Sequence, residues 1–237
     1  MAVAAKPIEP IEPKADPVTQ EMMAAGLHFG HKTSKTHPKM KPFITGVRNT
    51  VHIIDLEKTK EKLAEAVEYV RKLKAEGKTL LLIGTKVQQG PLVKETAEAC
   101  GLPYVTGRWI GGTFTNFNTI AKRVERLKEL EQQRDSGEWD EKYTKKEQQD
   151  LKEEIRVLEA TFGGIKDMSR VPDAVFICDL RENRLAAMEA KKKDVPIIAM
   201  ADTDTNPEEA DYFIPANNDA VSSIRYILEK IQEAWKA

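Results

Sequence analysis

The chain has 237 residues, of which 41% are hydrophobic and 32% charged, and its formal net charge at pH 7 is -1. This length suits one α/β core with an accessory element better than two full domains. No apolar run reaches the roughly 18 residues of a membrane-spanning helix, and the first residues lack the apolar core of a secretory signal. We therefore expect a cytoplasmic protein with no membrane partner.

The chain opens with a proline-rich segment and then alternates apolar and amphipathic runs. Residues 1–18 contain four prolines and a repeated "IEP", which predicts a disordered tail. Amphipathic runs that stop at Gly77 and Gly101, a third in "ENRLAAMEAKKK" and a last one after Asp219 predict helices. Six short apolar runs predict strands that are buried on both faces, at 51–55, 79–84, 103–107, 173–179, 195–201 and 211–215. This alternation predicts one α/β domain over residues 19–237, with a mostly parallel sheet and helices on both faces.

One segment, about 117–162, interrupts the alternation. Its two halves each carry apolar residues at spacings of three and four, the pattern of a coiled-coil seam. These residues are Phe117, Ile120, Val124 and Leu127 in the first half, and Leu151, Ile155, Leu158 and Phe162 in the second. "RDSGEW" predicts a turn between the halves, and Thr144 with Glu147 forms a capping-box pattern. We expect an antiparallel coiled-coil hairpin, and such an arm suggests a large partner.

The charges are segregated along the chain. From Met22 to Ile54 there is no Asp or Glu, and we call this stretch the acid-free stretch. Its basic residues are Lys32, Lys35, Lys39, Lys41 and Arg48. The segment from 202 to 219 has the opposite character, with six carboxylates. The first stretch is predicted to bind phosphate, whereas the second is interpreted as a solvated acidic edge, with a divalent-ion site as the alternative.

All four histidines lie within the acid-free stretch, and three of them, His28, His31 and His37, are clustered in residues 26–43. Their spacing could serve zinc, but zinc sites usually recruit thiolates or carboxylates, and neither is near in sequence. No acidic residue of the stretch would orient an imidazole as a general base. We therefore interpret them as packing or hydrogen-bonding residues, and we expect no metal, no cofactor and no catalytic residue. The cysteines, Cys100 and Cys178, are predicted to be reduced core thiols.

Two glycine-containing segments are candidate phosphate sites. "GTKVQQG" at 84–90 lacks the spacing of a phosphate loop, so Lys86 is interpreted as a phosphate-facing charge or a solvated lysine. "GRWIGGTFTNFNTI" at 107–120 could be a flexible loop that brings Arg108 and its backbone to a phosphate chain. Alternatively, it is a crossover whose aromatic residues pack beneath the hairpin. Phe117 fits the second interpretation, and Trp109 fits either. No glycine-rich turn follows the strand predicted at 51–55, which argues against a dinucleotide site.

Several segments in order resemble the ribosomal protein S-two family of the small ribosomal subunit, in its bacterial and organellar branch. They are "AAGLHFGHKTSKTHPKMKPFI", "RNTVHIIDLEKT", "IGTK", "RWIGGTFTNF", "GGIKDMSRVPDAVFICD" and "ADTDTNP…FIPANNDA". The resemblance implies a flavodoxin-like sheet with an inserted coiled-coil arm. It also implies binding to small-subunit ribosomal RNA and to neighbouring ribosomal proteins, including ribosomal protein S-one, near the messenger exit. Matching positions are the "HFGH" and "PKMKP" loop, Arg48, Lys86 and Arg108.

We therefore expect a structural RNA-binding protein without catalysis. The RNA-binding residues expected are Lys32, Lys35, Lys39, Lys41, Arg48, Lys86 and Arg108. One alternative is an α/β enzyme that acts on a phosphorylated small molecule through "GTK" and "ADTDTNP". Another is a scaffold that uses its hairpin for protein contacts only.

Overall fold

A computed structural model describes residues 16–237, except the side chains of residues 140 and 141. Most of the tail predicted for residues 1–18 lies outside these residues, and α1 (Pro17–Ala24) begins within its last two. The core is a five-stranded parallel sheet of order β5-β4-β6-β7-β8. Its strands are β4 (Leu80–Ile83), β5 (Tyr104–Val105), β6 (Ala174–Ile177), β7 (Ile197–Ala201) and β8 (Tyr212–Pro215). The predicted parallel sheet is confirmed.

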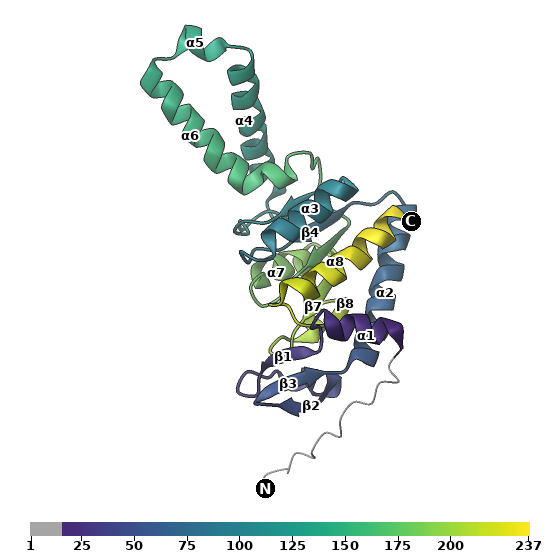
Figure 1. Ribbon diagram of the computed structural model, residues 1–237. Helices are drawn as coiled ribbons and strands as arrows, with labels where there is room; N and C mark the ends of the chain where they lie inside the picture. The colour runs from purple at the N-terminus through teal and green to yellow at the C-terminus, as the bar shows by residue number, and fades with distance from the viewer. Residues whose placement is uncertain (1–15) are drawn as a thin grey trace.

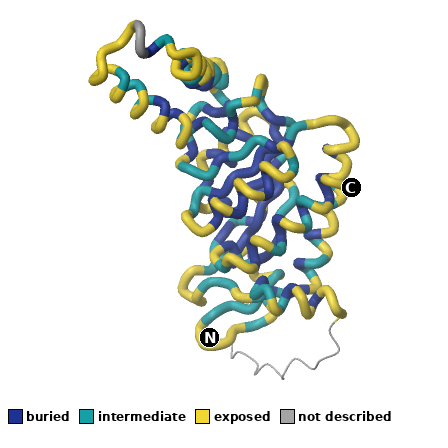
Figure 2. Tube along the Cα trace, turned by 45° about the horizontal axis from the view of Figure 1, so that its top comes forward, coloured by how far each residue is buried: buried dark blue, intermediate teal, exposed yellow. Residues whose placement is uncertain are grey.

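Helices cover both faces of this sheet (Figure 1). Because successive side chains of a strand point to opposite faces, Leu80 and Leu82 join one hydrophobic cluster and Leu81 and Ile83 the other. The first cluster packs against α2 (Leu56–Ala75), α3 (Gly90–Cys100) and α8 (Val221–Lys236). The second packs against α7 (Arg184–Lys192) and the segments before and after the hairpin. Both faces of the central strands β4, β6 and β7 are therefore buried, as Figure 2 shows along the middle of the molecule.

A second, three-stranded antiparallel sheet lies at one end of the molecule (Figure 1). We call it the small sheet. It has the order β1-β3-β2, with η1 between β1 and β2. Its elements are β1 (Phe29–Lys32), η1 (Pro38–Phe43), β2 (Ile44–Arg48) and β3 (Val51–Ile54).

The small sheet corrects two expectations. The strand predicted at 51–55 corresponds to β3, which is not part of the parallel sheet. Only Ile54 of β3 is buried, because β3 pairs with the polar strands β1 and β2. That stretch is not simply a loop. The turn at which a dinucleotide site would need its glycines follows β4, the first strand of the parallel sheet, and not the strand at 51–55.

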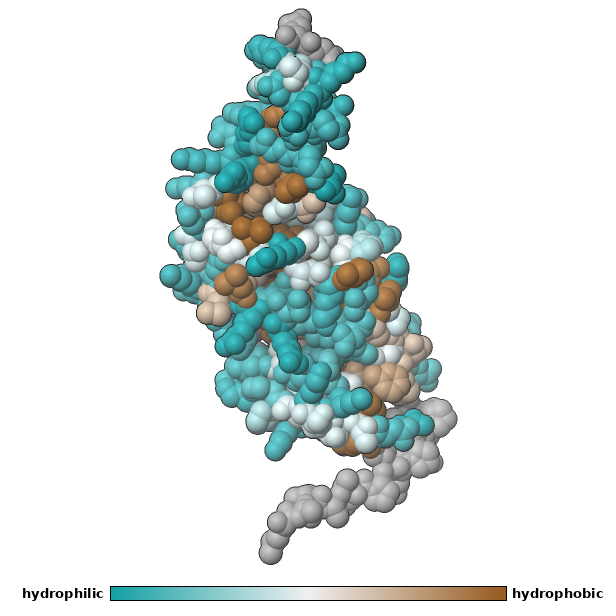
Figure 3. All heavy atoms as spheres, turned by 90° about the vertical axis from the view of Figure 1, so that its left-hand side faces the viewer, coloured by the Kyte–Doolittle hydropathy of each residue, from teal (hydrophilic) through white to brown (hydrophobic). Residues whose placement is uncertain are grey.

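The segment at 117–162 forms a helical hairpin at the opposite end from the small sheet (Figure 1). Its long helices are α4 (Phe117–Asp135) and α6 (Lys145–Phe162), and the short α5 (Glu138–Lys142) lies at the tip. Six of the eight predicted seam residues are buried, while Phe117 and Leu151 are half-buried. The capping box of Thr144 and Glu147 is confirmed. Figure 3 shows hydrophilic side chains over most of the hairpin, with hydrophobic ones gathered near its base.

Both cysteines are free of disulfides, and Cys178 is fully buried, which raises the pKa of its thiol. Among the helices within residues 16–237, none combines the length and hydrophobicity that spanning a bilayer requires.

Candidate nucleic-acid interface

The small sheet places two basic residues on one face. Lys32 ends β1 and Arg48 ends β2, and both pair with Val51 of the central strand β3. Residues directly opposite each other in an antiparallel pair point to the same face. Lys32 and Arg48 therefore lie on the same side, two strand spacings or about 10 Å apart.

A tight turn after Arg48 fixes the end of β2. Its two central residues, Asn49 and Thr50, have φ values of 49° and 66°. Two-residue hairpin loops of this kind match the twist of the flanking strands. A β-branched residue is strained in this region, so Thr50 is held there by its surroundings, which include a hydrogen bond from the Thr33 N–H to the Thr50 carbonyl at 2.9 Å.

Four of the five basic residues of the acid-free stretch are available to a partner. Lys32, Lys35, Lys41 and Arg48 are exposed, and none has a carboxylate partner among residues 16–237. Lys39 differs, since its ammonium group forms an ion pair with Glu208. The four unpaired cations carry charge that nothing in the described structure neutralises.

The acid-free stretch is anchored to the loop after β7. The His31 N–H donates to Thr203 Oγ1 at 2.9 Å, and the His37 N–H donates to the Thr203 carbonyl at 2.8 Å. Gly30 permits this approach, because a Cβ there would lie 2.5 Å from Thr203 Cγ2. The glycine of "HFGH" is thus required by packing. The basic side chains therefore extend from a fixed backbone. Little further backbone entropy is lost when a partner binds.

The three histidines do not converge on one another. His28 is half-buried beside Phe29, with ring centroids 3.9 Å apart, which fits the packing interpretation. His37 Nδ1 accepts the Lys39 N–H at 3.3 Å and caps η1. His31 is different, because its Nδ1 lies 3.0 Å from Asp202 Oδ2.

The acid-free stretch itself supplies no carboxylate for an imidazole, but Asp202, from outside the stretch, orients that of His31. The hydrogen bond with Asp202 raises the pKa of His31 against the opposing effect of burial, and the charges of Asp202, Asp204 and Asp219 add to the rise. Sequence reasoning missed this contact because Asp202 comes from the distant acidic edge. In the sequence, only the opposite charge of the two segments pointed to this contact.

Lys86 follows β4, which lies between β5 and β6 in the sheet. The strand order reverses at this point, and open α/β sheets usually bind ligands there. Its Nζ is 2.5 Å from Asp179 Oδ2 and 2.7 Å from Asp219 Oδ1. Burial would lower the pKa of Lys86, but its hydrogen bonds to these two carboxylates outweigh burial and raise it. Lys86 thus has two carboxylate partners and is not an isolated exposed cation.

Arg108 is exposed and lies apart from the small sheet. The preceding residue, Gly107, is at the hairpin base, where a Cβ would lie 3.3 Å from the Ala160 carbonyl oxygen. The next residue, Trp109, is buried against Phe114, with ring centroids 4.9 Å apart. Trp109 is therefore a packing residue and has no exposed face for stacking on a base.

The backbone of the glycine-rich segment binds a carboxylate of its own chain. Glu189 Oε1 accepts the Trp109 indole N–H and the Gly112 N–H at 3.2 and 2.8 Å. Its Oε2 accepts the N–H groups of Phe114 and Thr115 at 3.0 and 3.1 Å, and the Thr115 hydroxyl at 3.1 Å. The interpretation of a flexible loop that presents its backbone to phosphate is wrong. Burial would raise the pKa of Glu189, but these hydrogen bonds outweigh burial and lower it.

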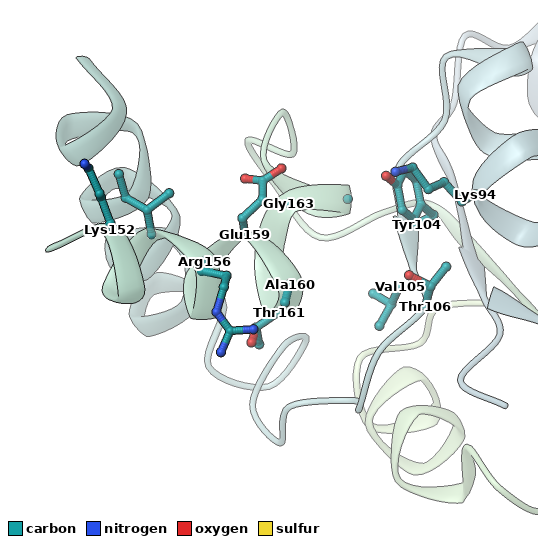
Figure 4. A pocket seen from close by; sticks show the side chains of 12 residues that line it. Lys94, Tyr104, Val105, Thr106, Lys152, Arg156, Glu159, Ala160, Thr161 and Gly163 are labelled. Carbon is teal, nitrogen blue, oxygen red and sulfur yellow. The ribbon is translucent and has the colours of Figure 1, made fainter. Parts of the chain in front are cut away.

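A cavity of about 450 Å³ lies between α6 and the sheet edge at β5 (Figure 4). Three basic side chains line it, Lys94 from α3 and Lys152 and Arg156 from α6. Arg156 already contacts Glu153 at 2.6 and 2.8 Å. Sequence reasoning missed this grouping, although Lys152 and Arg156 are four residues apart and so share a helix face.

A comparison with protein families agrees with the architecture. The family model described as Ribosomal protein S2 matches residues 22–237. The match begins at the first residue of the acid-free stretch and takes in the small sheet, the parallel sheet and the helical hairpin. A match of this extent decides the family, whose members are structural ribosomal proteins and not enzymes. The chain belongs to the ribosomal protein S2 family.

Proposed function

We propose that this protein is a structural constituent of the small ribosomal subunit, of the bacterial type, that binds small-subunit ribosomal RNA through the small sheet. One observation carries the proposal: Lys32, Lys35, Lys41 and Arg48 are exposed and have no carboxylate partner among residues 16–237. Such cations bind RNA phosphates and release counterions. The protein acts without catalysis on the cytoplasmic ribosome.

The other three residues expected to bind RNA differ in which existing ion pairs they would have to give up. Lys39 would have to exchange Glu208 for a phosphate, and Lys86 would have to leave Asp179 and Asp219. Arg108 needs no such exchange. It would contact a different RNA segment from the small sheet, because the preceding Gly107 packs against Ala160 at the hairpin base, and the hairpin and the small sheet lie at opposite ends of the molecule (Figure 1). We rank the four unpaired cations first and Arg108 next.

We further propose that α4 and α6 form a coiled-coil arm inserted into a single domain of residues 19–237. The ion pair of Arg126 with Glu154 at 3.2 Å and the buried seam residues support packing along the two helices. The arm extends away from the parallel sheet (Figure 1). It would give the protein a second contact with RNA or with neighbouring ribosomal proteins, among which we include ribosomal protein S-one.

The alternative of an enzyme for phosphorylated small molecules has less support. Its expected site is the crevice at the carboxyl ends of β4 and β6. There Lys86 is engaged by Asp179 and Asp219, and Asp204 lines the same cavity. Arg181 and Lys35 line this cavity too, but Arg181 is paired with Asp204, so two of its three basic side chains are already engaged by carboxylates, which disfavours a phosphate group.

The test is a salt series for binding to small-subunit RNA. The variant Lys32→Ala, Lys35→Ala, Lys41→Ala removes three unpaired cations. If each neutralises one phosphate, the log-log slope of affinity against salt should become shallower by roughly 2 to 3. The melting temperature should stay nearly unchanged, since these exposed side chains contribute little to folding.

The matched control is Lys72→Ala, Lys192→Ala, Lys193→Ala, which removes the same charge from exposed positions outside the small sheet. The control separates a general loss of charge from the loss of specific phosphate contacts. It should lower affinity slightly and leave the slope within one unit of wild type. Equal slopes for both triple variants would contradict the assignment of the small sheet as the RNA contact.

A further inference from the structure

A histidine and three aspartates meet beside the anchored end of β1. We call His31, Asp202, Asp204 and Asp219 the histidine–aspartate cluster. Ligand atoms of His31, Asp202 and Asp219 all lie within 4.8 Å of one another. His31 Nε2 is 3.5 Å from Asp219 Oδ2 and 3.8 Å from Asp204 Oδ2. Two ligand atoms bound to one zinc ion at about 2.0 Å in tetrahedral geometry are about 3.3 Å apart. The spacing of His31 Nε2 and Asp219 Oδ2 is close to this value, whereas Asp204 Oδ2 also pairs with Arg181 and would have to move away from Arg181 toward the imidazole.

The imidazole is oriented with its second nitrogen toward the other carboxylates. Asp202 is 1% exposed, and its Oδ2 lies 3.0 Å from His31 Nδ1, while its Oδ1 accepts the Thr203 N–H. A proton on Nδ1 then leaves the Nε2 lone pair facing Asp204 and Asp219. A carboxylate behind a histidine is the arrangement that orients metal-binding histidines in proteins.

The surrounding charges also favour a cation. Five carboxylates, of Asp179, Glu182 and the three aspartates of the cluster, lie around the cavity beside His31 with three basic residues, Lys35, Lys86 and Arg181. Lys86 contacts Asp219 through Oδ1, which leaves Oδ2 on the side of His31. Arg181 pairs with Asp204. The carboxylates exceed these cations by two charges, and a divalent ion would balance them.

A buried amide oxygen gives a separate indication of a ligand. Asn218 is 1% exposed, and its Oδ1 has no hydrogen-bond partner among the described residues. Asn218 lines the same cavity of about 280 Å³ as His31 and Asp204. A buried polar atom without a partner is costly. Water bound to a metal ion in this cavity would be a hydrogen-bond donor for it.

We propose that His31 Nε2, Asp204 and Asp219 bind a zinc ion, with Asp202 holding the imidazole and water completing the coordination. A donor set of one imidazole and two carboxylates suits zinc better than magnesium, which prefers oxygen ligands alone. The sequence argument against zinc rested on the lack of nearby carboxylates, and the fold supplies them from the acidic edge. Zinc would bridge β1 to the loops that follow β7 and β8.

The test uses the full chain without RNA, treated with a chelator and returned to buffer that contains magnesium. Titration with zinc chloride in a calorimeter should show one equivalent bound. At zinc concentrations about 100 times Kd, the melting temperature should rise by roughly 5 to 10 °C. Asp219→Asn is the informative variant, because Asp219 is half-exposed and its loss should not prevent folding. It should weaken zinc binding at least tenfold.

His37→Asn is the matched control, since it removes a nearby histidine but keeps an oxygen that can cap η1. It should bind zinc as wild type does. The proposal is overturned if wild type binds less than a tenth of an equivalent, or if Asp219→Asn binds with unchanged affinity. Equal weakening by both variants would also overturn it, because the zinc would then lie at the histidines of the acid-free stretch.

Discussion

Glu189 offers the sharpest test of how the hairpin base is held together. It is 6% exposed, and its carboxylate accepts bonds from three backbone N–H groups, the Trp109 indole and the Thr115 hydroxyl. In Glu189→Ala, four N–H donors would be left without an acceptor in a buried region. At about 1 to 3 kcal/mol for each unsatisfied group, and with partial relief by water, we expect a loss of about 3 to 5 kcal/mol.

Glu189→Gln separates the charge from the shape of the side chain. The amide keeps one acceptor oxygen, but its NH2 group would face N–H donors, so we expect a loss of about 2 to 3 kcal/mol near neutral pH. The folded-state pKa of Glu189 is lowered from 4.5. Its contribution is therefore present above the unfolded pKa and is lost as the pH falls through the folded pKa. The glutamine variant lacks this titration, so its deficit relative to wild type should shrink below about pH 4.5.

The assay is urea unfolding of wild type and both variants at several pH values between 7 and 3. Glu229→Gln, which changes an exposed glutamate of α8, is the control and should differ from wild type by less than about 0.5 kcal/mol. The reasoning is refuted if Glu189→Gln matches this control at pH 7. It is also refuted if the deficit of Glu189→Gln is the same at pH 7 and in acid.

Three further outcomes test other parts of the structure. Gly164→Ala should lower the free energy of unfolding by about 1 to 3 kcal/mol, because a Cβ there would lie 2.3 Å from the Tyr104 carbonyl oxygen; Gly111→Ala, with ordinary contacts, is the control in the same urea assay. Thr50→Gly should raise stability by about 0.5 to 1 kcal/mol by relieving a left-handed backbone, and a lower melting temperature would contradict the strain assigned there. Replacing residues 121–159 with a short linker should leave the parallel sheet folded by circular dichroism but reduce co-sedimentation with small subunits, and normal co-sedimentation would argue against a docking role for the arm.

The sequence by itself determined the elements of the parallel sheet and of the hairpin. Strands β4, β6 and β7 appear as apolar runs because both of their faces are buried. The capping box at Thr144 and the left-handed Gly101 after α3 are local features that depend only on adjacent residues. The segregation of acidic and basic residues was also readable without a structure.

The tertiary structure decided which residues meet. β3 has the composition of a buried strand, but its neighbours in space place it in the small sheet. Glu189, in the helix α7, fills the backbone cradle that the glycine-rich segment was expected to offer to phosphate. Asp202 comes from the acidic edge to orient His31. The physical reason is that a parallel sheet brings the carboxyl ends of strands distant in sequence to one edge, and local composition and periodicity carry no information about which side chains are paired there.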